Sequence, residues 1–129
     1  MFKLNRTIWI LFTALEMSAI VYLSVRPESQ GSGASISSQV FHKFGHLVAY
    51  SILTYLLLRS FLYFEKIDFN ERNKLLMMAF AIAVCFGAFN EFLQMFVPSR
   101  FARWYDILVN AIGSGAFISF VRKKDFLQK

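Results

Sequence analysis

The stretch LLMMAFAIAVCFGAFNEFLQMFV, residues 75–97, decides the fold, because it is apolar over most of its length and polar only near its end. A helix needs roughly 20 consecutive apolar residues to cross the hydrocarbon core of a membrane. Backbone groups within lipid must form their hydrogen bonds inside the segment itself, which favours a helix. The stretch therefore predicts a transmembrane helix.

Three further stretches approach the same length and composition. They cover residues 7–25, interrupted by Glu16; residues 44–64, interrupted by Arg59; and residues 104–121. The connections between the four stretches are short. Together they predict an all-α protein, a four-helix transmembrane bundle in a multi-pass protein of the cell membrane.

The composition agrees with a membrane protein that forms one domain over residues 1–129. The chain is 57% hydrophobic and 18% aromatic, more apolar than a soluble domain of this size can bury. Its net charge of +6 comes from basic residues scattered between apolar stretches. Nucleic-acid binding, which needs a basic stripe on a soluble face, is therefore not expected. The single cysteine, Cys85, excludes an internal disulfide.

The distribution of Lys and Arg predicts the orientation in the membrane. With the N-terminus inside, ten of the fourteen basic residues lie on the inner side and four on the outer side. Cytoplasmic loops of membrane proteins carry an excess of Lys and Arg. Both termini are therefore expected in the cytoplasm.

With that orientation, polar residues of three helices fall at similar depths near the outer boundary. The second helix carries three of them at spacing i, i+3, i+7, and the fourth helix repeats that spacing, so each set shares one helix face. Ionisable groups within a membrane are costly and normally face the bundle interior or a water-filled cavity. The candidate ligand-binding residues are Lys43, His46, Tyr50, Glu91, Gln94, Arg100, Arg103, Asp106 and Asn110.

Structural roles compete with binding at each of these positions. Lys43 and Arg103 could serve as anchors at helix ends, with their charges reaching the membrane surface. Gln94 and Asn110 could instead hydrogen-bond between helices. Glu16, near the middle of the first helix, is expected either to be protonated and packed inward or to bond another helix.

Three motifs resemble the signatures of VanZ-like membrane proteins. Residues 43–50, KFGHLVAY, resemble Asp-Lys-x-x-His-Phe-x-x-Tyr; residues 90–100, NEFLQMFVPSR, resemble Glu-x-x-Gln-x-Phe-x-Pro-x-Arg; and residues 106–113, DILVNAIG, resemble Asp-x-x-x-Asn-x-x-Gly. The resemblance extends over about residues 23–121. His42 departs from it, because it stands where the family usually carries Asp.

The resemblance implies a role at the cell envelope, since the founding member is associated with resistance to teicoplanin, a lipidated glycopeptide. The first hypothesis is a module that binds a lipid-linked envelope precursor or a lipidated ligand at the outer leaflet. Membrane lipids are the other expected partners of the protein. The second is a membrane enzyme, with His46, Glu91 and Asp106 as candidate acid–base groups. The third is a structural subunit of a membrane complex. No metal and no cofactor are expected, and transport is the least favoured alternative because Glu16 alone extends a polar path inward.

Overall fold

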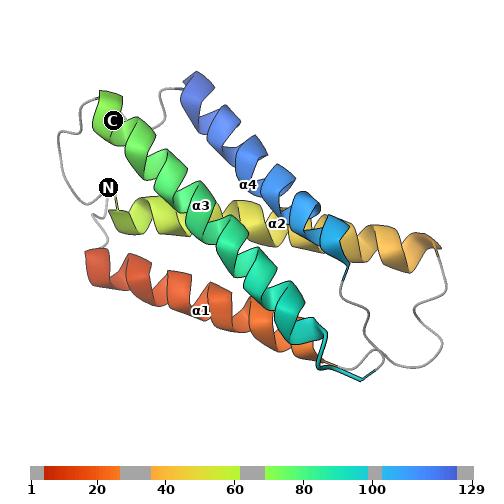
Figure 1. The fold of residues 1–129 in the computed structure, drawn as a ribbon. Helices are drawn as coiled ribbons and strands as arrows, with labels where there is room; N and C mark the ends of the chain where they lie inside the picture. The colour runs from red at the N-terminus through yellow and green to blue at the C-terminus, as the bar shows by residue number, and fades with distance from the viewer. Residues whose placement is uncertain (1–4, 27–35, 62–68, 99–102, 125–129) are drawn as a thin grey trace.

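The structure, a computed structural model, describes residues 5–26, 36–61, 69–98 and 103–124, and only the backbone of residues 38, 39, 123 and 124. These residues form four helices and no strand: α1 (Arg6–Val25), α2 (Ile36–Phe61), α3 (Phe69–Gln94) and α4 (Trp104–Lys124) (Figure 1). Each contains a segment long and apolar enough to cross a membrane. The predicted all-α bundle of four membrane-length helices is therefore confirmed.

The helices differ from the predicted ranges mainly at their ends. α2 and α3 begin at Ile36 and Phe69, before the predicted residues 44 and 75, and they end at Phe61 and Gln94. Hydropathy marks the part of a helix that lies in hydrocarbon, whereas helical hydrogen bonding continues through the polar residues beyond it. The early start of α2 places His42 within a helix, one turn before His46.

Large apolar side chains cover much of the bundle surface, and the interior contains polar side chains beside an apolar core. Asn90, Asn110 and Ser114 are fully buried, whereas Leu15 is 65% and Phe96 70% exposed. The apolar surface suits contact with lipid tails, since no water is present there to drive apolar side chains inward. The interior is consequently where the polar groups of the bundle meet.

α2 makes the most extensive contacts of the four helices, with large interfaces to α1 and α4 and a smaller one to α3. Its interface with α4 is the largest in the bundle, and that between α1 and α3 is the smallest. α3 crosses in front of α2 in Figure 1, with α1 and α4 on either side. The small α1–α3 interface leaves a groove between these two helices.

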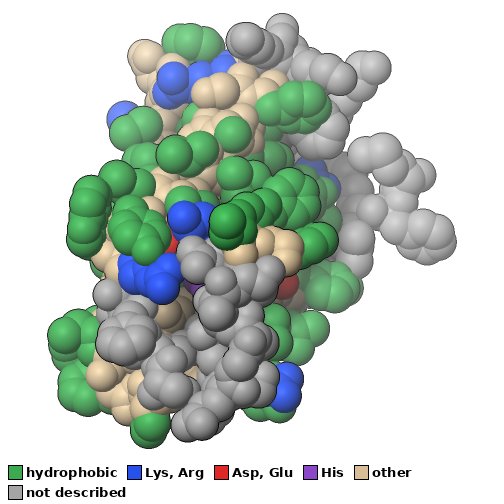
Figure 2. Space-filling model, turned by 90° about the vertical axis from the view of Figure 1, so that its right-hand side faces the viewer, with side chains coloured by type: hydrophobic (Ala, Val, Ile, Leu, Met, Phe, Trp, Pro, Cys, Tyr) green, Lys and Arg blue, Asp and Glu red, His purple; other side chains and the backbone are tan. Residues whose placement is uncertain are grey.

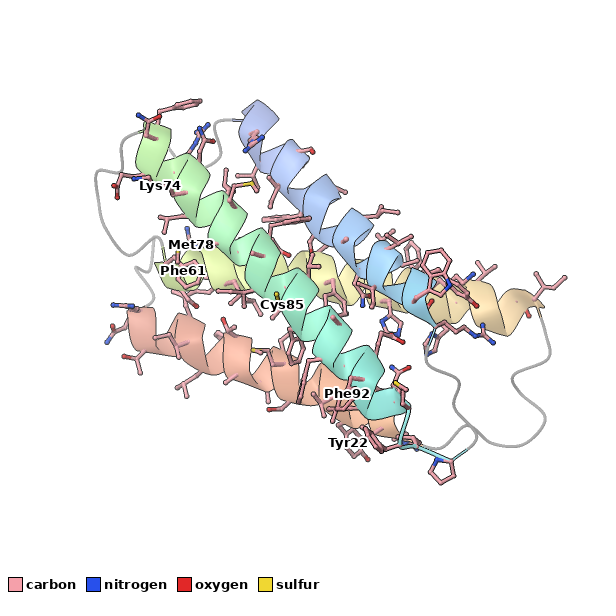
Figure 3. The ribbon with its side chains drawn as sticks, viewed as in Figure 1. Tyr22, Phe61, Lys74, Met78, Cys85 and Phe92 are labelled. Atoms are coloured by element: carbon pink, nitrogen blue, oxygen red, sulfur yellow. The ribbon has the colours of Figure 1, made fainter. Side chains whose placement is uncertain are left out.

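The two ends of the bundle have different chemistry. One end, called the polar end here, contains the last turns of α1 and α3 and the N-terminal parts of α2 and α4. At the opposite end, the Arg59 guanidinium lies 4.7 Å from the centre of the Trp9 ring, and the Thr13 and Ser60 hydroxyls are 3.0 Å apart. Figure 3 labels Tyr22 at the polar end and Lys74 at the opposite one.

Candidate functional site

The polar end contains a group of polar side chains from all four helices, most of them buried. Within α2, α3 and α4 these residues recur one turn apart, so they lie on the face that each helix turns inward. We call them the polar cluster: Ser24, His46, Tyr50, Asn90, Glu91, Gln94, Asp106 and Asn110.

Close contact between α2 and α4 forms one side of the cluster. A Cβ atom on Gly113 would lie 2.5 Å from the Leu47 carbonyl oxygen, so α4 can approach this closely only with glycine there. The Ser51 hydroxyl donates to the Gly113 carbonyl at 2.9 Å. One turn nearer the polar end, His46 Nδ1 lies 3.2 Å from Asn110 Oδ1. Because an amide oxygen only accepts, this bond assigns a proton to Nδ1.

A hydrogen bond between α1 and α3 forms a second side. The Asn90 amide nitrogen donates to the Ser24 hydroxyl at 2.6 Å, and both side chains are buried. The bond joins the two helices that otherwise make the smallest interface. Amide and hydroxyl groups often link transmembrane helices in this way, because neither finds a partner in lipid.

Two buried carboxylates lie at the N-terminus of α4. Glu91 Oε2 accepts the backbone N–H of Arg103, at 3.2 Å, and this amide immediately precedes the helix. Asp106 lies in the first turn and is also buried. The N-terminus of a helix carries partial positive charge from its unpaired N–H groups. This field helps to explain how two carboxylates are accommodated at the end of an apolar bundle.

Tyr50 lies at the centre of the cluster with no exposed surface. Its ring is nearly parallel to that of His46, with 6.2 Å between the centroids, and it contacts Phe86 of α3 on another side. The Tyr50 hydroxyl lies near enough to Glu91 to interact with it electrostatically. Gly87 makes room for this arrangement, because a Cβ atom there would lie 3.2 Å from Cε1 of Tyr50.

Two polar atoms of the cluster have unused hydrogen-bonding capacity. Within the described part of the chain, no hydrogen-bond partner is found for Gln94 Nε2 or Asn110 Nδ2. Both side chains are at most 3% exposed. A buried polar group without a partner costs about 1–3 kcal/mol. The cluster can therefore provide two amide donors, whereas the Tyr50 hydroxyl interacts with the Asn90 side chain.

Basic side chains lie beside the cluster at the polar end. Lys43 Nζ and Arg103 Cζ lie 5.0 Å and 5.8 Å from the centre of the Tyr105 ring, so positive charges from α2 and from the residue before α4 meet at one aromatic ring. Figure 2, which views the bundle from this end, shows basic side chains near the middle of the face with hydrophobic ones above and to the left of them. Arg100 lies outside the described residues.

The structure thus brings eight of the nine candidate ligand-binding residues to one end of the bundle. Ser24, Asn90 and Tyr105 belong to the same region but were not among the candidates. Ser24 could have been found by extending the comparison of depths to the last turn of the first helix. Glu16 is half-buried on α1, about two turns from Ser24, and is not part of the cluster.

The histidines and carboxylates do not form a metal site within the described residues. No group of three or more His, Cys, Asp or Glu side chains there could hold an ion. The rings of His42 and His46 are 4.6 Å apart, on successive turns of α2.

The comparison with protein families agrees with the resemblance seen in the motifs. The VanZ/LLP1 family model matches residues 2–124, nearly the whole chain. Comparisons with curated proteins and with solved structures find no match. The four membrane-length helices and the family match together describe a multi-pass membrane protein. The chain belongs to the VanZ/LLP1 family.

Proposed function

We propose that this protein binds the polar head of a lipid-linked or amphiphilic cell-envelope ligand at the outer leaflet of the cell membrane. The unused hydrogen-bonding capacity of the polar cluster carries the proposal. Packing alone would favour apolar residues or fully paired polar ones at such positions, because each unpaired buried group lowers stability. A bound head group would recover that cost.

The chemistry of the unused atoms indicates the kind of head group. The Gln94 and Asn110 amide nitrogens are both donors. Lys43 and Arg103 add positive charge next to them. Donors beside cations suit phosphate, carboxylate or sugar oxygens. Head groups of lipid-linked envelope precursors present these oxygens next to an apolar chain.

The outer leaflet follows from the distribution of basic residues. α1 begins and α4 ends at the same end of the bundle, opposite the polar end. In the sequence, ten of the fourteen Lys and Arg residues fall before α1, between α2 and α3, after α4, or in the helix ends next to these segments. The positive-inside tendency therefore assigns the polar end to the outer side. Reporter fusions at Ser35 and at the C-terminus test this, and a cytoplasmic signal at Ser35 would overturn it.

Equilibrium binding to the purified protein tests the proposal. The probe is radiolabelled undecaprenyl phosphate, an anionic lipid carrier of the bacterial envelope, added to protein in a neutral detergent. We expect weaker binding for Gln94→Met, which removes an unused donor with little change in shape. Lys74→Gln at the opposite end is the matched control, because Lys74 is exposed there. Equal binding by the wild type, Gln94→Met and an Asn110→Leu variant would refute the proposal for this probe.

The family resemblance suggests that binding of this kind contributes to teicoplanin resistance in the cell. Teicoplanin joins a lipid chain to a polar glycopeptide, so it has the amphiphilic character of the proposed ligands. We expect expression in a susceptible host to raise the minimum inhibitory concentration of teicoplanin, and Gln94→Met to reduce that rise. Vancomycin, which lacks the lipid chain, is the matched control compound.

A catalytic role is the second candidate, and the buried carboxylates at the N-terminus of α4 favour it. Glu91 and Asp106 are buried at the polar end, where His46 bonds Asn110. Groups of this kind often serve as acids or bases when the environment alters their proton affinity. Formation of a product from undecaprenyl-linked sugars, abolished by Glu91→Gln while binding persists, would favour the enzyme over the binding module.

A further inference from the structure

A groove of about 500 Å³ runs along the seam between α1 and α3. It is lined by Met17, Ser18, Val21, Tyr22, Val25 and Phe86. The Ser18 hydroxyl donates to the Ala14 carbonyl at 2.8 Å, so the polar group in this wall already has its partner. The groove is therefore an apolar surface, open on the side where α1 and α3 face the lipid.

We propose that this groove holds an acyl chain of an anionic amphiphile from the leaflet at the polar end. This inference rests on the proposed function and deepens it, since it assigns the apolar part of the ligand to a place beside the polar cluster. Three observations carry it: the length and position of the groove, the charge at its outer end, and its connection to the cluster.

The length and position of the groove match one leaflet. Its α1 residues run from Met17 to Val25, a rise of about 12 Å along the helix. One leaflet contributes roughly half of the 30 Å hydrocarbon core. Val25 is the last residue of α1, so the groove reaches from the membrane boundary at the polar end towards the bilayer centre. An acyl chain that enters from this leaflet has the same direction and depth.

The end of the groove that lies at the membrane boundary carries positive charge. The Arg26 guanidinium lies 5.8 Å from the centre of the Tyr22 ring, and Tyr22 itself lines the groove. Figure 3 labels Tyr22 near this end of α1. A head-group phosphate attached to a chain in the groove would lie at the depth of Arg26. One basic residue near a charged lipid surface contributes about 1 kcal/mol, which favours an anionic amphiphile over a zwitterionic one.

One residue connects the groove with the polar cluster. Phe86 lines the groove, and its ring also contacts the ring of Tyr50, with 6.4 Å between the centroids. The last turn of α1 also contains Ser24, which is buried and bonds Asn90 of the cluster without lining the groove. A ligand with its chain in the groove therefore has its polar part at the same end of the bundle as the cluster.

Photocrosslinking tests the inference in the full-length protein. Phosphatidylglycerol and phosphatidylcholine, each with a diazirine in its acyl chain, are incorporated into vesicles with the protein, and adducts are mapped by mass spectrometry. We expect phosphatidylglycerol adducts to concentrate on groove residues, at about five times the level for phosphatidylcholine, the ratio that one basic residue supports. Arg26→Gln should remove this preference and leave some adducts.

Two groove-filling variants, Val21→Trp and the smaller Ser18→Leu, should lower these adducts. Leu11→Trp is the matched control, because Leu11 is an exposed residue of α1 outside the groove. Adducts spread evenly over the lipid-facing residues, or unchanged in both groove-filling variants, would overturn the inference. If undecaprenyl phosphate binding still depends on Gln94 in that case, the groove is refuted and the proposed function stands. If groove adducts persist but Gln94→Met and Asn110→Leu both leave undecaprenyl phosphate binding unchanged, the groove stands and the proposed function is refuted.

Discussion

Replacing Gly113 by alanine should separate α2 from α4 and disrupt the polar cluster. The added Cβ would lie 2.5 Å from the Leu47 carbonyl oxygen and 3.1 Å from the Leu47 Cα. Both are backbone atoms, so no side-chain rotation relieves the contact. An ordinary carbon–oxygen contact is roughly 3.3–3.6 Å, which means that α4 has to move away from α2 by about 1 Å.

The expected loss of stability has two parts. Overpacking of a well-packed interior typically costs about 1–3 kcal/mol. The 2.9 Å bond from the Ser51 hydroxyl to the Gly113 carbonyl would also lengthen, and such bonds between membrane helices contribute roughly 0.6 kcal/mol. We therefore expect Gly113→Ala to lower the free energy of unfolding by about 2–4 kcal/mol. The 3.2 Å contact from His46 to Asn110 should weaken with it.

Unfolding by sodium dodecyl sulfate, followed by circular dichroism in mixed micelles, measures this loss. The chain offers two matched controls on the same pair of helices. A Cβ on Gly115 would meet a Phe80 ring carbon at 3.8 Å, and one on Gly45 would meet nothing within 4 Å. Alanine at these two positions should be neutral or stabilising by up to about 1 kcal/mol, since alanine favours helices over glycine. Equal stability of the Gly113 and Gly115 variants would refute the reasoning.

Three further predictions address the other contacts of the cluster. In a double-mutant cycle of SDS unfolding, Ser24→Ala and Asn90→Ala should show a coupling energy of about 0.6–1.7 kcal/mol, as expected for a buried hydrogen bond between membrane helices. Additive effects of the two substitutions would refute the bond. Glu91→Gln keeps an oxygen that can accept the backbone N–H at the start of α4 but removes the charge, so it should lower the free energy of unfolding by less than about 1 kcal/mol. Glu91→Ala removes the acceptor as well and should lower it by more. Equal losses of stability in the two variants would contradict this role of Glu91. Gly87→Ala places a Cβ 3.0 Å from the Asn110 amide nitrogen. It should shift the ¹⁵N resonance of that amide while changing stability by less than Gly113→Ala does, and an unchanged resonance would count against the contact.

The helices could be predicted from the sequence because their apolar length alone requires them. Their ends could not, since residues 70–74, near the start of α3, are polar and continue the helix beyond the hydrocarbon. Helical spacing also predicted which residues share a face. It did not predict the pairing of Ser24 with Asn90, because that bond depends on how α1 and α3 rotate against each other. The convergence of Lys43 and Arg103 on Tyr105 depends in the same way on the packing of α2 against α4.

Gln94→Met separates a binding role for the cluster from a structural one. Gln94 is buried, and its Nε2 has no partner among the described residues. If the cluster only held the helices together, removing this amide would destabilise the bundle. If the amide instead serves a ligand, it is unpaired in the unliganded protein and lowers the stability there by about 1–3 kcal/mol. Methionine has a similar shape and no unpaired donor. It should therefore leave the free energy of unfolding unchanged or raise it. SDS unfolding and undecaprenyl phosphate binding of the same variant therefore make one test. A gain or no change in stability together with weaker binding supports a site, whereas a loss of more than about 1 kcal/mol with unchanged binding means that the amide is part of the scaffold.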